Sequence, residues 1–194
     1  MTPERIPFGP GVIILGGGAL FLSAALFLGF LLPTDWEADA SVIVPATPEA
    51  VFAYLDSPEG WRAWTHWPDS GLIREGPLRG VDARIRWDDP ELGSGSFRLV
   101  AVQPYERVIY AVEVGGGAMR TEGSVALAVE GSGVRVTWHE EGNLGRNPLM
   151  GYWAFFMDRA QATELEKGLA RLRALLAEES AAEAPADSVE ADAA

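Results

Sequence analysis

The sequence has no cysteine, which excludes disulfide bonds, thiolate nucleophiles and cysteine-ligated zinc or iron–sulfur centres. Histidine is nearly as scarce, and its two residues, His66 and His139, cannot form a metal site by themselves. Basic residues are also few, because 15 Lys and Arg stand against 28 Asp and Glu, for a formal net charge of −13. We therefore expect no nucleic acid partner, since neutralising phosphates requires a basic surface.

Charge is missing from one long stretch, the 22 residues from Gly11 to Leu32. At about 1.5 Å per residue, a helix of this length crosses a hydrocarbon core of about 30 Å. Residues 1–34 are thus predicted to be an N-terminal membrane anchor with a transmembrane helix at 11–32. A cleaved signal peptide is the alternative, because an Ala-x-Ala sequence occurs at Ala38–Ala40. Signal peptides, however, have a basic start and an apolar region of only about 7–15 residues.

The orientation of this anchor follows from the basic residues that flank it. Arg5 precedes the apolar run, whereas Asp35, Glu37 and Asp39 follow it. Because the positive-inside rule counts basic residues and largely ignores acids, the N-terminus is expected in the cytoplasm. The sequence therefore predicts a single-pass membrane protein with its domain on the extracytoplasmic side.

The C-terminal residues 178–194 contain six acids, no basic residue and no aromatic residue. Such a segment cannot bury enough apolar surface to offset its ordering entropy. We predict a disordered acidic tail there, which leaves residues 35–177 as the functional domain. This length is sufficient for a substantial core.

The middle of the chain alternates apolar and polar residues in segments bounded by Gly and Pro, which is typical of strands with one buried face. Before the second of these segments, Thr47-Pro48 and Ser57-Pro58 each carry the start signal of a short helix. The predicted strands are Trp36–Val44, Gly71–Glu75, Asp82–Trp87, Ser96–Val102, Arg107–Val114, Arg120–Glu130 and Val134–Glu140.

After Asn147-Pro148 the period changes to three to five residues, which predicts one long amphipathic helix of about 25–30 residues. Its apolar positions are Leu149, Trp153, Phe156, Ala160, Leu165, Leu169, Leu172 and Leu176. The buried face of the antiparallel sheet is the surface available to this helix. A sheet curved around a helix does not close along its whole length, so a concave apolar cavity suited to a small ligand is expected between them.

Three segments resemble the SRPBCC superfamily of START-like, helix-grip proteins, and more narrowly its polyketide cyclase/dehydrase and lipid-transport branch. They are Val44–Trp64, Val134–Gly142 and Phe155–Glu178. The resemblance implies an α+β helix-grip fold, with a curved antiparallel sheet of about seven strands wrapped on a long C-terminal helix. It implies a ligand cavity but no catalytic residues, because members of this superfamily share no catalytic constellation.

Candidate site residues are mainly aromatic, because aromatic side chains supply area and shape for an apolar ligand. Alternation places His139 on the outer face of its strand, whereas His66 lies near the expected cavity mouth. Asp158 is expected to point sideways and pair with an arginine of the sheet. The predicted cavity lining is Trp61, Trp64, Trp67, Trp87, Tyr110, Trp138, Trp153 and Phe156.

No Walker loop, dinucleotide fingerprint, nucleophile elbow or HExxH motif occurs, so no catalytic residue, metal or cofactor is predicted. The leading hypothesis is a membrane-tethered binding or carrier domain for a lipid or another hydrophobic small molecule. The alternative is a polyketide cyclase- or dehydratase-like enzyme that uses the same cavity. A cavity with a carboxylate or histidine of perturbed pKa favours the enzyme. A protein-interaction domain at the membrane is a third possibility.

Overall fold

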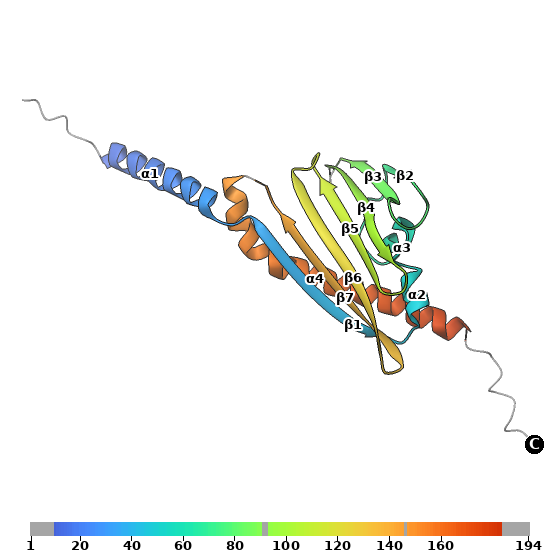
Figure 1. Cartoon of the computed structure of the whole chain (residues 1–194). Helices are drawn as coiled ribbons and strands as arrows, with labels where there is room; N and C mark the ends of the chain where they lie inside the picture. The colour runs from blue at the N-terminus through green and yellow to red at the C-terminus, as the bar shows by residue number, and fades with distance from the viewer. Residues whose placement is uncertain (1–9, 91–92, 146, 184–194) are drawn as a thin grey trace, which may run out of the picture.

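The computed structural model describes residues 10–90, 93–145 and 147–183, and Figure 1 shows their arrangement. One long helix precedes a seven-stranded sheet, and another follows it. The elements are α1 (Pro10–Leu31), β1 (Asp35–Val44), α2 (Pro48–Phe52), α3 (Pro58–Arg62), β2 (Leu72–Glu75), β3 (Arg84–Asp89), β4 (Gly93–Gln103), β5 (Arg107–Val114), β6 (Met119–Glu130), β7 (Gly133–Asn143) and α4 (Pro148–Glu183).

The sheet is antiparallel throughout, with the strand order β1-β7-β6-β5-β4-β3-β2. The last strand in the sequence, β7, thus lies between β1 and β6, and β1 closes one edge. Alternation of side chains decides which face is buried: in β7, Val134, Val136, Trp138 and Glu140 point inward. Each predicted strand is confirmed, with ends that differ by at most three residues from the observed ones.

The two short helices start where the sequence predicts them. The Thr47 hydroxyl accepts a hydrogen bond from the Ala50 amide, and the Ser57 hydroxyl accepts one from the Gly60 amide. These hydrogen bonds satisfy amides that lack partners at a helix start. The capped helices place Trp61 and the following Trp64 in the core beside the sheet.

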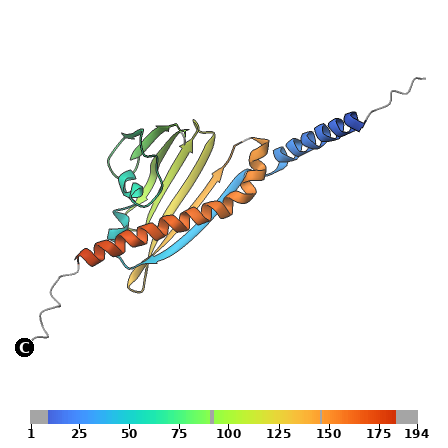
Figure 2. The ribbon, with the colours of Figure 1, turned by 180° about the vertical axis from the view of Figure 1, so that it is seen from behind.

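Helix α4 lies across the inner face of the sheet, as Figure 2 shows. Its C-terminal half buries Leu165, Leu169, Leu172 and Leu176 against that face. The helix has 36 residues and ends at Glu183, so residues 178–183 of the predicted acidic tail are helical. The remaining residues of that prediction, 184–194, lie outside the described residues.

The N-terminal half of α4 differs from its prediction. Leu149, Trp153 and Phe156 are exposed rather than packed on the sheet. The step from Ala160 to Leu165 is five residues, and at about 100° per residue it rotates the apolar stripe by about 140°. Helix α4 therefore carries two apolar stripes on nearly opposite faces, whereas the sequence interpretation treated them as one.

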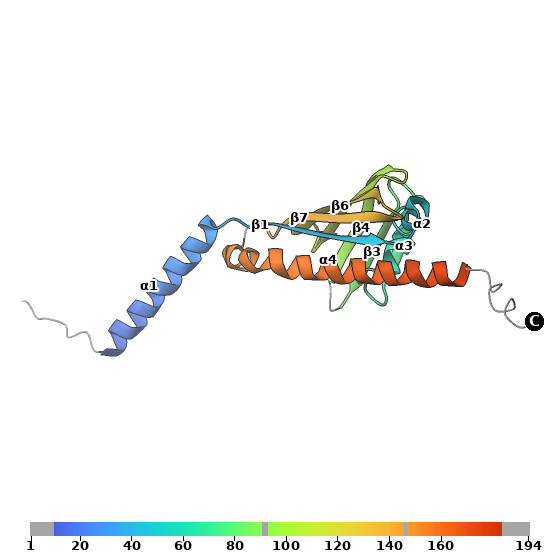
Figure 3. The ribbon, with the colours of Figure 1, turned by 90° about the horizontal axis from the view of Figure 1, so that it is seen from below.

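Helix α1 is uncharged, and its residues Ile14–Leu31 have the length and mean hydropathy, 2.1, of a helix that can cross a membrane. A signal sequence near an N-terminus has the same properties. The apolar side chains of α1 are largely exposed. Figure 3 shows α1 leaving the domain at the end where α4 begins, and the two helices are in contact there.

Candidate ligand-binding site

A cavity of about 640 Å³ lies between α4, the middle strands of the sheet and the segment that follows α3. Its size is within the usual range for small-molecule sites, about 300–1,000 Å³. Most of its wall is apolar, and aromatic rings provide much of it. The lining residues are Trp61, Thr65, His66, Trp67, Pro68, Trp87, Phe97, Tyr110, Val112, Val114, Met119, Trp138, Glu140, Gln161, Glu164, Leu165 and Arg171.

Five of the predicted aromatic residues line this cavity: Trp61, Trp67, Trp87, Tyr110 and Trp138. They come from four separate parts of the chain, and the fold alone brings them together. Phe97 joins them, with its ring 5.3 Å from Trp61 and 5.2 Å from Tyr110 between ring centroids. The sequence interpretation did not include Phe97, although its alternation within β4 marks it as inward-facing.

Trp64 has a different position from the other predicted aromatic residues of α3 and its vicinity. It is fully buried and does not line the cavity. Its ring centroid lies 4.8 Å from those of Trp61 and Trp138. Trp64 therefore supports the cavity wall from behind by fixing the two rings that do face the cavity.

Trp153 and Phe156 do not lie in the cavity, in contrast to their prediction. They are 58% and 64% exposed, respectively. Both belong to the N-terminal stripe of α4, which the five-residue step places on the face away from the sheet. The residues of α4 that do reach the cavity are Gln161, Glu164, Leu165 and Arg171.

The cavity has one polar end, which the sequence interpretation did not identify. Tyr110 of β5, Gly123 of β6 and Glu140 of β7 form one row across the sheet. Because Gly123 has no side chain, the Tyr110 ring lies over β6; a Cβ at this position would be 2.2 Å from that ring. The Tyr110 hydroxyl therefore reaches the Glu140 carboxylate one strand farther on and donates a hydrogen bond to it.

Further hydrogen bonds fix this polar end. The Trp138 indole N–H donates to the Tyr110 hydroxyl oxygen at 2.6 Å. Gln161 of α4 donates its amide N–H to the second carboxylate oxygen of Glu140 at 2.5 Å. The carboxyl group is thus held by groups from the sheet and from the helix. The position of Glu140 had a sequence signal, since it follows the inward-facing Trp138 by two residues within one strand.

Burial raises the pKa of the Glu140 carboxyl above its ordinary value, and the hydrogen bonds from Tyr110 and Gln161 only partly oppose this shift. Burial also raises the pKa of the Tyr110 hydroxyl well above its ordinary value, and the nearby Glu140 carboxylate adds to the shift. Removing both groups from water disfavours their charged forms. A carboxyl group in this setting is suited to hydrogen-bonding a neutral polar group or to exchanging a proton at moderate pH.

Ionisable side chains also line the cavity. His66, Glu164 and Arg171 line it, and the Arg171 guanidinium donates a hydrogen bond to the Trp64 carbonyl at 2.7 Å. This bond ties α4 to the segment after α3. His66, which was predicted near the cavity mouth, is among the residues that line the cavity.

The other two polar candidates lie away from the cavity. His139 lies on the outer face of β7, where its Nδ1 atom is 2.9 Å from an Asp39 carboxylate oxygen. Asp158 accepts a hydrogen bond from the backbone amide of Glu37 at 3.2 Å. It therefore binds one amide at the edge of β1, and among the described residues it does not form the expected pair with an arginine of the sheet.

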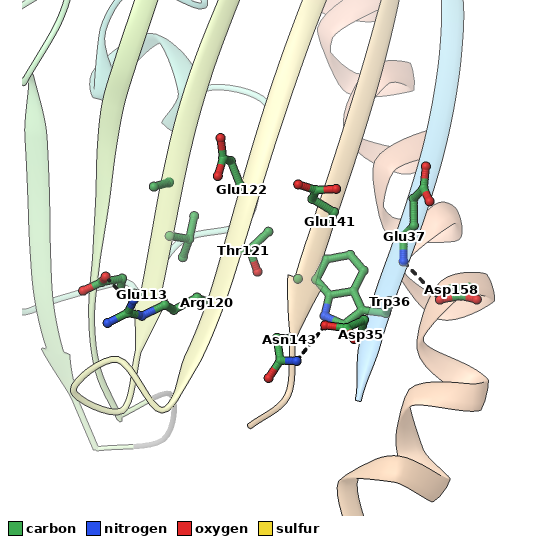
Figure 4. Close-up of a pocket in the computed structure, with 13 residues that line it drawn as sticks. Asp35, Trp36, Glu37, Glu113, Arg120, Thr121, Glu122, Glu141, Asn143 and Asp158 are labelled. Atoms are coloured by element: carbon green, nitrogen blue, oxygen red, sulfur yellow. Dashed lines mark hydrogen bonds and ion pairs between the residues drawn. The ribbon is translucent and has the colours of Figure 1, made fainter. Parts of the chain in front are cut away.

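A second concave region, the acidic pocket, has a volume of about 710 Å³ and lies near the ends of β1, β5, β6 and β7. Figure 4 shows its carboxylates, with Glu37, Glu141 and Glu122 on neighbouring strands. These three are direct cross-strand partners, an arrangement that like charges disfavour. Arg120 pairs with Glu113, and the basic side chain nearest to the row is His139, whose ring nitrogens lie 3.8 Å from Glu37 and 4.0 Å from Glu141. This surface repels anions and is poorly suited to an apolar ligand.

Within the described part of the chain, one group of side chains has the spacing of metal ligands. Ligand atoms of Glu37, Asp39 and His139 lie within 4.8 Å of one another. The two carboxylates are exposed on the outer face of the sheet, and exposed acidic groups often have this spacing without binding an ion. The cavity chemistry does not involve this group.

Comparison with known proteins matches residues 35–177 to the family described as polyketide cyclase/dehydrase and lipid transport. No curated protein matches the chain. The Thermus thermophilus protein TTHA0849 has a similar structure, with a TM-score of 0.57 and 21% identity over 74% of this chain and 99% of that one.

Two further solved structures share the architecture. The Mesorhizobium loti protein MLL2253 has a TM-score of 0.52 and 14% identity over 73% of this chain and 97% of that one. The Aha1 dimer from Colwellia psychrerythraea has a TM-score of 0.50 and 17% identity over 72% and 95% of the two chains. At such identities the similarity establishes the fold and not the ligand.

Proposed function

The chain belongs to the polyketide cyclase/dehydrase and lipid transport family of the SRPBCC superfamily, and from this premise we propose that it is a membrane-anchored binding or carrier domain. Its ligand is a lipid or another hydrophobic small molecule held between α4 and the sheet. The observation that carries the proposal is the aromatic cavity of about 640 Å³. Trp67, Trp87 and Met119 contribute to its apolar walls.

The polar end of the cavity narrows the ligand class. Glu140, Tyr110 and Gln161 lie together there, and burial favours the neutral form of the carboxyl group. A neutral carboxyl can donate one hydrogen bond and accept others. We expect a ligand with an apolar body and one uncharged polar group, such as a carbonyl or a hydroxyl, near Glu140.

Helix α1 provides the membrane anchor in this proposal. Its residues Ile14–Leu31 are apolar, uncharged and exposed in the protein, which suits contact with lipid chains. Arg5 before the helix favours the cytoplasmic side for the N-terminus. The domain then lies on the extracytoplasmic side, and removal of α1 as a signal peptide is the competing outcome.

Mass spectrometry of the full chain released from mild detergent, combined with lipid extraction, tests the binding function. We expect a stoichiometric apolar molecule bound to the wild type and a marked loss of it in Trp67→Ala. Trp153→Ala is the matched control, because it makes the same substitution outside the cavity. Absence of any bound molecule from the wild type, or equal loss in both variants, contradicts the proposal.

An enzymatic function is the second candidate, and the buried Glu140 carboxyl favours it. A carboxyl with a raised pKa beside an apolar cavity can act as a general acid or base on a polyketide-type substrate. Glu140→Gln keeps the size of the side chain and one accepting oxygen, but it replaces the other oxygen with a donating NH2 and removes the acid–base function of the carboxyl group. If the molecule bound in the cavity is converted to product by the wild type and stays bound but unchanged in Glu140→Gln, the chain is an enzyme. If neither protein converts it, the carrier function stands.

A further inference from the structure

The first ten residues of α4, 148–157, are all uncharged, and they present an apolar face outward. Leu149, Tyr152, Trp153 and Phe156 are exposed on this face. Their spacing of three, four and seven residues from Leu149 places them on one side of a helix. Gly151 and Ala154 on the other side are buried. We call the exposed set the aromatic face of α4.

The aromatic face lies beside the end of α1. The Tyr152 hydroxyl donates a hydrogen bond to the Ala25 carbonyl at 2.7 Å. The two backbones also approach closely, since a Cβ at Gly29 would be 2.1 Å from the Pro148 carbonyl oxygen and one at Gly151 would be 2.6 Å from the Leu32 Cβ. These contacts fix the start of α4 against the last two turns of α1.

The contact with Ala25 sets the depth of the aromatic face. Ala25 precedes the last residue of α1, Leu31, by six residues, and at about 1.5 Å per residue this is about 9 Å along the helix. If α1 spans a bilayer with Leu31 at the edge of the hydrocarbon core, the Tyr152 hydroxyl reaches about 9 Å below that edge, so the aromatic face extends from the interface into the outer half of the core. The side chains around Tyr152 must then meet lipid.

We infer that the aromatic face of α4 lies in the lipid–water interface of the membrane that α1 spans, so that the domain is held against the bilayer at two places. The inference rests on the proposed anchor function of α1. Trp and Tyr are the residues enriched at this level of membranes, because their rings are apolar and their N–H or O–H groups are polar. A short uncharged helical segment followed by Asp158 and Arg159 is also typical of an interfacial helix.

A second copy of the chain could also cover the aromatic face, but the observations favour lipid. The aromatic face continues directly into the exposed apolar surface of α1 through the Tyr152–Ala25 contact. The acidic pocket lies at the same end of the sheet, near Asp35 and Asn143. Because its carboxylates repel anions, the membrane with which the domain makes closest contact should present zwitterionic headgroups.

Spin labels at single cysteines in the full chain test this inference, and the absence of native cysteine leaves no background. The chain is placed in phosphatidylcholine vesicles, and each label is measured for collisions with oxygen, which enters lipid, and with a nickel chelate, which stays in water. The labelled variants are Leu149→Cys and Trp153→Cys on the aromatic face. Ala170→Cys is the matched control, an exposed position farther along the same helix. Leu22→Cys reports on α1.

We expect labels at positions 149 and 153 to collide severalfold more often with oxygen than with the nickel chelate, as the label at position 22 does. The label at position 170 should show the reverse. If position 22 is lipid-exposed but 149 and 153 behave like 170, the aromatic face lies in water and the inference is wrong while the anchor stands. A water-exposed label at position 22 overturns the anchor itself. Strong spin–spin broadening at 153 shows a second copy on this face and also overturns the inference.

Discussion

The opposed stripes of α4 lead to a prediction about two chemically identical substitutions in one helix. Leu172 belongs to the stripe that faces the sheet and is fully buried, whereas Leu149 belongs to the aromatic face and is 57% exposed. Leu→Ala removes the same atoms at both positions and favours the helix slightly at both. The difference in unfolding free energy between the two variants therefore reports which side of α4 packs on the domain.

The burial of each leucine sets the magnitude of its effect. Removing a fully buried leucine costs about 2–5 kcal/mol, because the lost transfer free energy and the cavity left behind add together. Less than half of the Leu149 side chain is buried, so the substitution loses less than half of a transfer free energy of about 1.5–3 kcal/mol. The expected cost is about 1 kcal/mol or less. At about 2–4 °C per kcal/mol for a protein of this size, Leu172→Ala lowers the melting temperature by about 4–20 °C and Leu149→Ala by less than about 4 °C.

The assay is thermal and urea unfolding of the full chain in mild detergent, followed by tryptophan fluorescence. The buried rings of Trp61, Trp64 and Trp138 provide the signal. If Leu149→Ala destabilises the protein as strongly as Leu172→Ala, the first turns of α4 pack their apolar face on the domain. The description of two opposed stripes is then wrong.

Three further substitutions test the polar end of the cavity and the contact between helices. Because the Glu140 carboxyl has a raised pKa in the folded protein, the folded state retains a proton that the unfolded chain releases. The free energy of unfolding should therefore fall as pH rises above the ordinary carboxyl pKa of 4.5. Glu140→Gln should abolish this decline, as urea midpoints across a pH series will show. Gly123→Ala pushes the Tyr110 ring away from its place over β6, which should cost about 1–3 kcal/mol in urea unfolding and weaken ligand binding. Gly151→Val collides with Leu32 and should speed protease cleavage between α1 and the domain.

The sheet could be predicted from the sequence because alternation is a local property. In β7, Val134, Val136 and Trp138 alternate with polar residues, and two-residue periodicity is enough to define both the strand and its buried face. The caps at Thr47 and Ser57 are local as well. These signals predicted the order of elements and, together with the resemblance, the fold.

Helix α4 shows where periodicity fails. Spacings of three to five residues from Leu149 to Leu176 fit one amphipathic helix if each step is considered alone. The step from Ala160 to Leu165 moves the apolar positions to the other side of the helix. Only the rotation about the helix axis, summed over all steps, predicts that Trp153 and Phe156 face away from the sheet. A count of apolar positions does not contain this information.

The polar end of the cavity depends on register, which the sequence did not specify. Glu140 could be assigned to the inner face from alternation, but its partners could not. Tyr110, Gly123 and Glu140 meet because three strands pair with particular offsets, and Gln161 completes the set from a helix whose rotation was unknown. Cavity volume likewise results from packing between distant segments.

The link between α1 and β1 determines how far a bound molecule can travel. It consists of Leu32, Pro33 and Thr34, and the Thr34 carbonyl accepts a hydrogen bond from the Leu144 amide at 3.0 Å. At about 3.3–3.6 Å per residue, three residues reach only about 10 Å even when fully extended. With α1 in a bilayer, the cavity stays within one domain length of that bilayer and cannot shuttle between distant compartments. The bound molecule is then exchanged with the protein's own membrane or with an acceptor that comes to the domain. The rate of transfer to such an acceptor depends on the acceptor's concentration rather than on diffusion of this protein.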